Sequence, residues 1–114
     1  MDSKTYILKE LETLIIKFPN IRIRYEYDSS ALVHFIEVVP NEIYHLNNEY
    51  IAWENNMDDR FIALFPTENI CFISDDALVG IENVEYTLYG LEYALFLPKN
   101  RNIHIPFGIL SQIQ

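Results

Sequence analysis

The feature that most constrains the fold is a long amphipathic stripe in the middle of the chain. Large apolar residues recur there at steps of three and four positions: Leu46, Tyr50, Trp53, Met57, Phe61 and Leu64. This spacing places them on one side of an α-helix, so the pattern predicts a helix over residues 42–65 that buries this side. Asn41 is a suitable N-cap for this helix, and Pro66 ends it.

The segment before this stripe predicts a shorter helix followed by a β-hairpin. Apolar residues at helical spacing indicate a helix over residues 3–18, which Asp2 or Ser3 can cap. Residues 21–27 then alternate between apolar and polar, which is typical of a half-buried strand. A second strand is expected over residues 32–39.

The turn between these two strands also suggests a register. A two-residue loop at Ser29-Ser30 would place Tyr25 opposite His34 and Arg22 opposite Glu37. The first pair lies on the apolar face, where we interpret His34 as a hydrogen-bonded core residue rather than a catalyst. The second pair brings opposite charges together across the strands, which is favourable.

The remainder of the chain predicts further strands. Residues 69–74 form a short apolar run, and residues 84–89 and 92–97 read as a hairpin around Gly90-Leu91. The tail from Ile103 to Gln114 is a candidate edge strand. The expected order is α-β-β-α-β-β-β: a single α+β domain over residues 1–114, with a mostly antiparallel sheet of about five strands and two helices on one face.

The charge of the chain is distributed unevenly. Residues 25–98 hold fourteen acidic side chains and one basic side chain, Arg60, which gives this stretch a formal charge of −13 within a net charge of −9. Such a field repels nucleic acid and anionic membranes and attracts basic surfaces. A basic protein is therefore the expected partner.

Several classes of function lack their sequence signature. The chain has no glycine-rich phosphate loop, and its one cysteine, Cys71, lies in an apolar run and reads as a small buried hydrophobe. His45 and Glu49 are four residues apart and could form half of a metal site, but no third ligand is evident. We therefore expect no enzyme, no cofactor and no metal. The lack of a signal sequence or a membrane-length apolar run indicates a cytoplasmic protein.

The acidic residues around the long helix are the candidate partner-binding site, with the following members: Glu49, Glu54, Asp58, Asp59, Asp75 and Asp76. Such a surface could neutralise or escort a basic protein, and the composition is similar to that of small acidic immunity proteins and bacterial secretion chaperones. Three alternatives remain open. The charges could serve only solubility, carboxylates could form the cleft of a small hydrolase, or the chain could be a structural, oligomeric protein.

One strand face is too apolar for open solvent. Val33, Phe35 and Val39 share the side of their strand that helices on the other face cannot cover. Either the tail from Ile103 to Leu110 folds over this face, or the face forms a homodimer or partner interface.

Overall fold

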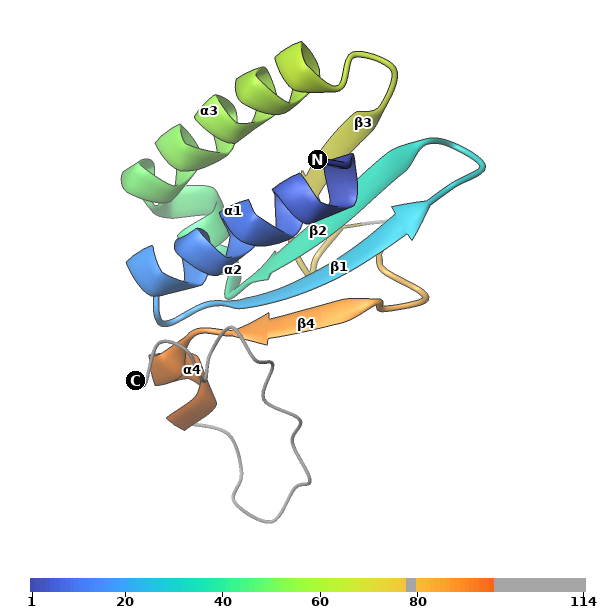
Figure 1. Ribbon diagram of the computed structural model, residues 1–114. Coiled ribbons are helices and arrows are strands. Elements are labelled where there is room, and N and C mark those ends of the chain that lie inside the picture. The colour runs from blue at the N-terminus through green and yellow to red at the C-terminus, as the bar shows by residue number, and fades with distance from the viewer. Residues whose placement is uncertain (78–79, 96–114) are drawn as a thin grey trace. The chain divides into compact units, whose positions relative to one another are not determined.

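The structure, a computed structural model, describes residues 1–77 and 80–95. Within them it contains four helices and a four-stranded sheet of order β3-β2-β1-β4 (Figure 1). The elements are α1 (Ser3–Lys17), β1 (Arg22–Asp28), β2 (Val33–Val39), α2 (Asn41–Leu46), α3 (Asn48–Leu64), β3 (Asn69–Ile73), β4 (Tyr86–Tyr89) and α4 (Leu91–Leu95).

The predicted α+β class is confirmed, and the predicted strand arrangement is wrong. We expected about five mostly antiparallel strands, whereas the sheet is mixed, because β2 and β3 run parallel with Phe35 beside Cys71. The parallel pairing follows from the connection between these strands. Because α2 and α3 carry the chain back along the sheet, β3 enters it in the same direction as β2.

The chain divides into two compact units. One comprises Met1–Ile23 and Thr87–Gln114, and the other comprises Arg24–Tyr86. The tail that was expected to add a strand or to cover Phe35 lies outside the described residues. No helix in residues 1–77 and 80–95 combines the length and the apolar character that a bilayer crossing requires.

In the first unit, α1 confirms the helix predicted over residues 3–18. The side chain of Asp2 accepts a hydrogen bond from the Thr5 N–H at 2.7 Å, so this residue is the N-cap. The apolar side of α1 is fully buried at Ile7, Leu11, Leu14 and Ile15. This burial is what the helical spacing predicted.

The predicted hairpin over residues 84–97 is wrong. Strand β4 ends at Tyr89, and the chain then forms the short helix α4, whose Glu92 and Tyr93 N–H groups donate to the Pro19 carbonyl. We expected Gly90 to provide a positive φ in a tight turn, but no glycine in the described residues has one. A Cβ at Gly90 would instead overlap the Pro19 carbonyl, so glycine permits a close approach of two backbones.

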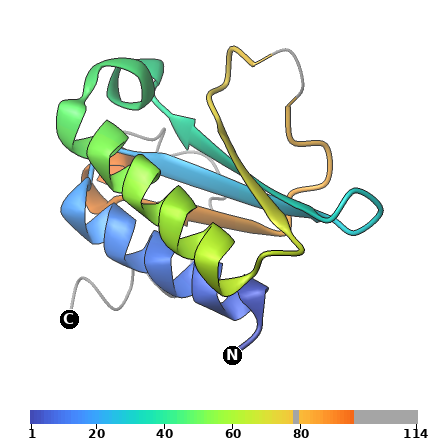
Figure 2. The ribbon, with the colours of Figure 1, turned by 90° about the horizontal axis from the view of Figure 1, so that it is seen from above.

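In the second unit, the predicted long helix is two helices. The break lies at Asn47, whose side chain accepts a hydrogen bond from the Tyr50 N–H at 3.0 Å and caps α3. The ribbon changes direction between α2 and α3 (Figure 2). Leu46 therefore falls at the end of α2 and is 74% exposed, contrary to its expected burial. Trp53 is half-buried, whereas the expected burial of Tyr50, Met57 and Phe61 is confirmed.

The strand predictions for this unit hold, and the contact of Tyr25 with His34 is present. The Tyr25 hydroxyl lies 2.6 Å from Nδ1 of His34. Glu37 forms two hydrogen bonds with Arg24, at 2.7 and 3.0 Å, where the sequence had suggested Arg22 as its partner. The ion pair accounts for the burial of a carboxylate on an otherwise apolar strand.

Candidate functional site

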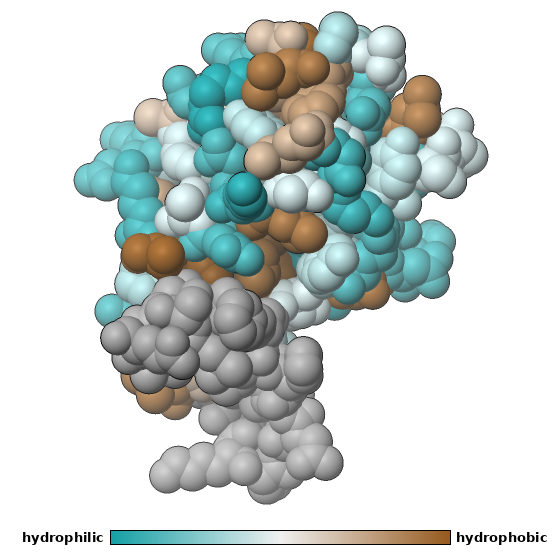
Figure 3. Space-filling model, in the orientation of Figure 1, coloured by the Kyte–Doolittle hydropathy of each residue, from teal (hydrophilic) through white to brown (hydrophobic). Residues whose placement is uncertain are grey.

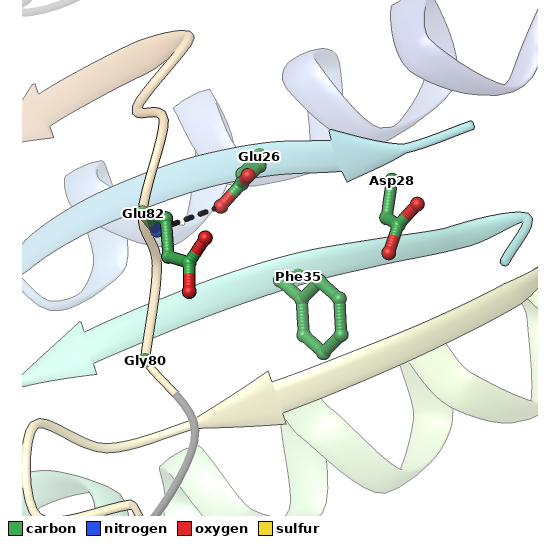
Figure 4. Close-up of a pocket in the computed structure, with 5 residues that line it drawn as sticks. All are labelled: Glu26, Asp28, Phe35, Gly80 and Glu82. Carbon is green, nitrogen blue, oxygen red and sulfur yellow. Dashed lines mark hydrogen bonds between the residues drawn. The ribbon is translucent and has the colours of Figure 1, made fainter. Parts of the chain in front are cut away.

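A hollow with a cavity volume of about 170 Å³ lies on the second unit (Figure 4). We call it the acidic hollow, and it is lined by Glu26, Asp28, Phe35, Gly80 and Glu82. The close-up looks onto the face of the strands that lies away from α3, and the segment bearing Gly80 and Glu82 crosses this face. The hollow thus combines three carboxylates with one aromatic ring.

The alternation of β1 explains why two of these carboxylates point the same way. Side chains two positions apart share a strand face, so Arg24, Glu26 and Asp28 lie on the side opposite the buried Ile23 and Tyr25. Asp28 ends the strand, and its Oδ1 accepts hydrogen bonds from the N–H and hydroxyl of Ser30 and the N–H of Ala31. This turn fixes the position of the Asp28 carboxylate.

The third carboxylate arrives from a segment far away in the sequence. The Glu82 N–H donates to Oε1 of Glu26 at 2.9 Å. Two further hydrogen bonds tie the same segment to β1: the Tyr27 N–H donates to Oε2 of Glu85 at 2.6 Å, and the Glu85 N–H donates to the Tyr25 carbonyl at 2.9 Å. Residues 80–85 are therefore fastened across the strand face, although they form no helix or strand.

Among the residues that the structure describes, no basic side chain lines the acidic hollow. The nearest arginine along β1, Arg24, is engaged with Glu37. Hydrogen bonds from Ser30 and Ala31 lower the pKa of Asp28, so this carboxylate is ionised at neutral pH. The three lining carboxylates form a negative site whose floor, Phe35, is a flat apolar surface suited to the stem and charge of a lysine or arginine side chain.

The apolar face predicted around Val33, Phe35 and Val39 is smaller than expected. Val39 is buried, and Val33 and Phe35 are half-buried. The crossing segment with Gly80 and Glu82 reduces this face, and it does so from within the same unit. The predicted homodimer through these three residues stays a prediction.

The six predicted site residues do not form one surface patch of equal exposure. Glu49, Asp59, Asp75 and Asp76 are exposed. Glu54 and Asp58 are half-buried on α3, close to Tyr44 of α2. Figure 3 shows a mainly hydrophilic face with apolar surface at the C-terminal end of α3, where Ile62 and Leu64 are exposed.

Burial raises the pKa values of Glu54 and Asp58. Desolvation raises the pKa of Glu54 in spite of a hydrogen bond from the Tyr50 hydroxyl at 3.0 Å. Desolvation, and then the charge of Asp59, raise the pKa of Asp58. Burial raises the pKa of the Tyr44 hydroxyl to about 12, and the nearby charges of Glu54 and Asp58 add to this rise.

Asp76 and His45 form a separate surface contact. Nε2 of His45 lies 3.4 Å from Oδ2 of Asp76, and the Ser74 hydroxyl donates to the other oxygen of Asp76. The Ser74 hydrogen bond is the largest cause of the lowered pKa of Asp76; the His45 contact adds to it, whereas burial acts in the opposite direction. Within residues 1–77 and 80–95, no group of three His, Cys, Asp or Glu side chains is arranged to hold a metal ion.

His34 is a hydrogen-bonded core residue, as the sequence suggested. Its side chain is 1% exposed, with Nδ1 at the Tyr25 hydroxyl and Nε2 2.6 Å from Oε1 of Glu68. Tyr27 stacks on its ring, and Phe61 contacts it edge-on. Cys71 is half-buried rather than fully buried, and desolvation raises the pKa of its thiol, which disfavours the reactive thiolate.

Sequence reasoning missed the residues of the acidic hollow, except for Phe35. The sequence predicted a strand that ended at residue 27, whereas β1 extends to Asp28 and so brings it to the face of Glu26. Glu82 is 56 residues from Glu26, and nothing in the sequence links the two. A comparison of the chain with models of protein families, with curated proteins and with solved structures finds no match.

Proposed function

We propose that this chain is a small cytoplasmic binding module that neutralises or escorts a basic protein, and that the acidic hollow receives a lysine or arginine side chain of that partner. The observation that carries the proposal is the convergence of Glu26, Asp28 and Glu82 around Phe35, with no basic side chain among the lining residues in the described part of the chain. A partner cation would supply the missing charge.

The chemistry of the hollow suits such a side chain. The alkyl stem of a lysine or arginine can lie on the Phe35 ring while its charged end meets the carboxylates. A cation–π contact contributes about 0.5–1 kcal/mol at an exposed site, and a surface ion pair contributes a similar amount. Several such contacts are needed for a specific complex, so the surrounding acidic surface is part of the proposal.

The long-range field supports the same reading. Because residues 25–98 carry a formal charge of −13, a cationic protein would be attracted before contact, and the rate of association would rise. Salt would reduce this effect, since charges in solution are screened within about 8 Å at physiological ionic strength.

Asp28 is unsuited to be the acid of a hydrolase. A glycoside hydrolase uses a carboxylic acid with a raised pKa next to an ionised carboxylate. In the hollow, hydrogen bonds lower the pKa of Asp28, so this residue is not the carboxylic acid of such a pair. We propose binding, and no reaction, at this site.

The proposal is tested by calorimetric titration with a hexalysine peptide at low salt. We expect the double variant Glu26→Gln and Glu82→Gln to weaken binding at least fivefold, because the glutamine amides retain the shape of the hollow without its charge. The control is Glu12→Gln with Asp59→Asn, which removes the same two charges from exposed positions outside the hollow. Equal losses in both double variants would mean that only net charge matters, and would remove the hollow from the proposal.

A further inference from the structure

The outer edge of β3 is a second feature of the same unit that bears on the partner. Strand β3 is the terminal strand of the sheet, with β2 on one side, and no other described strand pairs with it. The Asn69 N–H donates to the Leu32 carbonyl at the start of β2, so Asn69, Cys71 and Ile73 direct their backbone groups toward β2. Ile70 and Phe72 therefore direct theirs away from the sheet.

A side-chain hydrogen bond is consistent with this direction. The Tyr44 hydroxyl of α2 donates to the Phe72 carbonyl at 2.8 Å, which covers one acceptor of the outer edge. The N–H and carbonyl of Ile70 and the N–H of Phe72 are left facing outward. Edge strands with such groups are sites where extended segments of other proteins add to a sheet.

The α3 side of the sheet next to this edge carries acidic side chains, and one of their carboxylate oxygens lacks a hydrogen bond from the described residues. Ile70 and Phe72 are paired with the buried His34 and Ile36, so their side chains lie on the α3 side of the sheet, where Phe72 contacts Trp53. Glu54 and Asp58 lie on α3, close enough to Tyr44, which bonds the Phe72 carbonyl, for their charges to add to the raised pKa of its hydroxyl. Oδ1 of Asp58 is buried and makes no hydrogen bond within the described part of the chain.

A buried carboxylate oxygen without a donor is costly, and a cation or an N–H group from a partner would relieve that cost. Asp58 and Glu54 lie close enough to β3 to affect a residue on it. After burial, their charges contribute to the raised pKa of the Cys71 thiol. The edge thus offers backbone groups, and α3 beside it offers negative charge.

We infer that the basic partner adds an extended segment to the outer edge of β3, pairing with Ile70 and placing lysine or arginine side chains beside Glu54 and Asp58. This inference rests on the proposed function, because it takes the partner to be basic. It assigns the binding mode: main-chain hydrogen bonds give affinity, and cations at alternate positions of the added strand give specificity. Tyr44 restricts the register, since it occupies the Phe72 carbonyl.

The test uses a heptapeptide of alternating lysine and valine, and a copy that is N-methylated at its three central residues. The copy keeps every lysine and loses the N–H groups that strand pairing needs. We expect the parent peptide to bind at least fivefold more tightly than the copy. Nuclear magnetic resonance should show slower hydrogen exchange at the Ile70 N–H in the complex with the parent peptide.

Variants of neighbouring aspartates provide a matched pair. We expect Asp58→Asn to weaken binding of the parent peptide at least fivefold and Asp59→Asn to weaken it less than twofold. Equal binding of the two peptides with an unchanged Ile70 exchange rate would overturn strand addition, while resonance shifts of Glu26 and Glu82 with both peptides would leave the acidic hollow supported. A parent peptide that does not bind at all would overturn both proposals.

Discussion

The backbone N–H of Glu82 donates to Oε1 of Glu26 at 2.9 Å, and this contact joins two acidic residues that are 56 positions apart in the chain. The proximity of two carboxylates is tolerated because one of them accepts a backbone hydrogen bond. The segment of residues 80–85 is thus held against β1, and its Gly80 and Glu82 line the acidic hollow.

The first prediction concerns the anchoring of this segment. Replacing Glu85 with alanine removes the acceptor of the Tyr27 N–H and should lower the free energy of unfolding by about 1 kcal/mol. Hydrogen exchange at the Tyr27 N–H should become faster by the factor that corresponds to this change in free energy. The control is Glu85→Gln, which retains an acceptor oxygen and should lose less than half as much; urea denaturation measures both. Equal losses would show that the charge, and not the hydrogen bond, holds the segment.

The second prediction concerns the buried chain of Tyr25, His34 and Glu68. Replacing Tyr25 with phenylalanine leaves Nδ1 of a 1% exposed histidine without this partner, and should cost about 1–3 kcal/mol of the free energy of unfolding. Tyr86 is partly exposed, so Tyr86→Phe serves as the control and should change stability by less than about 0.5 kcal/mol. Equal denaturation midpoints for the two variants would contradict a structural role for the Tyr25 hydroxyl.

The third prediction concerns the dependence of stability on pH. The pKa values of Glu54 and Asp58 are raised in the folded chain, so the folded state binds more protons than the unfolded state as pH falls from neutrality toward about 4. Stability should therefore increase over that interval through these two groups. The lowered pKa values of Asp28 and Asp76 act in the opposite direction, and their contribution is lost only below about pH 4.

Asp58→Asn isolates this effect. The variant should raise the melting temperature at pH 7, because it removes a desolvated charge, and it should flatten the rise in stability between pH 7 and pH 5. Asp75→Asn is the control, since Asp75 is exposed and is not among the charges that shift the pKa of Asp58. Thermal unfolding at several pH values measures the difference. A lower melting temperature for Asp58→Asn at pH 7 would indicate that the carboxylate is stabilised in the free protein.

The fourth prediction concerns self-association through Val33, Phe35 and Val39. Val39 is buried and contributes little outer surface, so a homodimer would depend on Val33 and Phe35. If the homodimer forms, Phe35→Asp should convert it to a monomer in sedimentation equilibrium. If the wild-type chain is monomeric at high protein concentration, the homodimer prediction is wrong, and the acidic hollow is the one proposed site on this face.

Local patterns predicted the elements that depend on local physics. The helical spacing of apolar residues and the Asp2 cap predicted α1. Alternation between apolar and polar residues predicted β1, and the expected pairing with β2 included the contact of Tyr25 and His34. The break at Asn47 was hidden because the apolar spacing continues across it from Leu46 to Tyr50. Only the capping side chain of Asn47 distinguishes one helix from two, and asparagine is compatible with both.

Long-range contacts determine the parts that were mispredicted. Residues 91–95 form α4 instead of the predicted strand, because the Pro19 carbonyl accepts two N–H groups from the start of the helix. The acidic hollow depends in the same way on residues 80–85 lying across β1. Charge density led to the proposal of a basic partner, but it directed attention to α3 rather than to Glu26 and Glu82, which line the acidic hollow.

The central claim is that the acidic hollow binds a cationic side chain, and resonance mapping tests it most directly. The chain is titrated with hexalysine, and the shift of each backbone amide is followed to saturation. The account predicts saturable shifts at Glu26, Asp28, Phe35, Gly80 and Glu82, which disappear in the Glu26→Gln and Glu82→Gln double variant and persist in the Glu12→Gln and Asp59→Asn control. Shifts that do not saturate, or that leave these five residues unchanged, would contradict it.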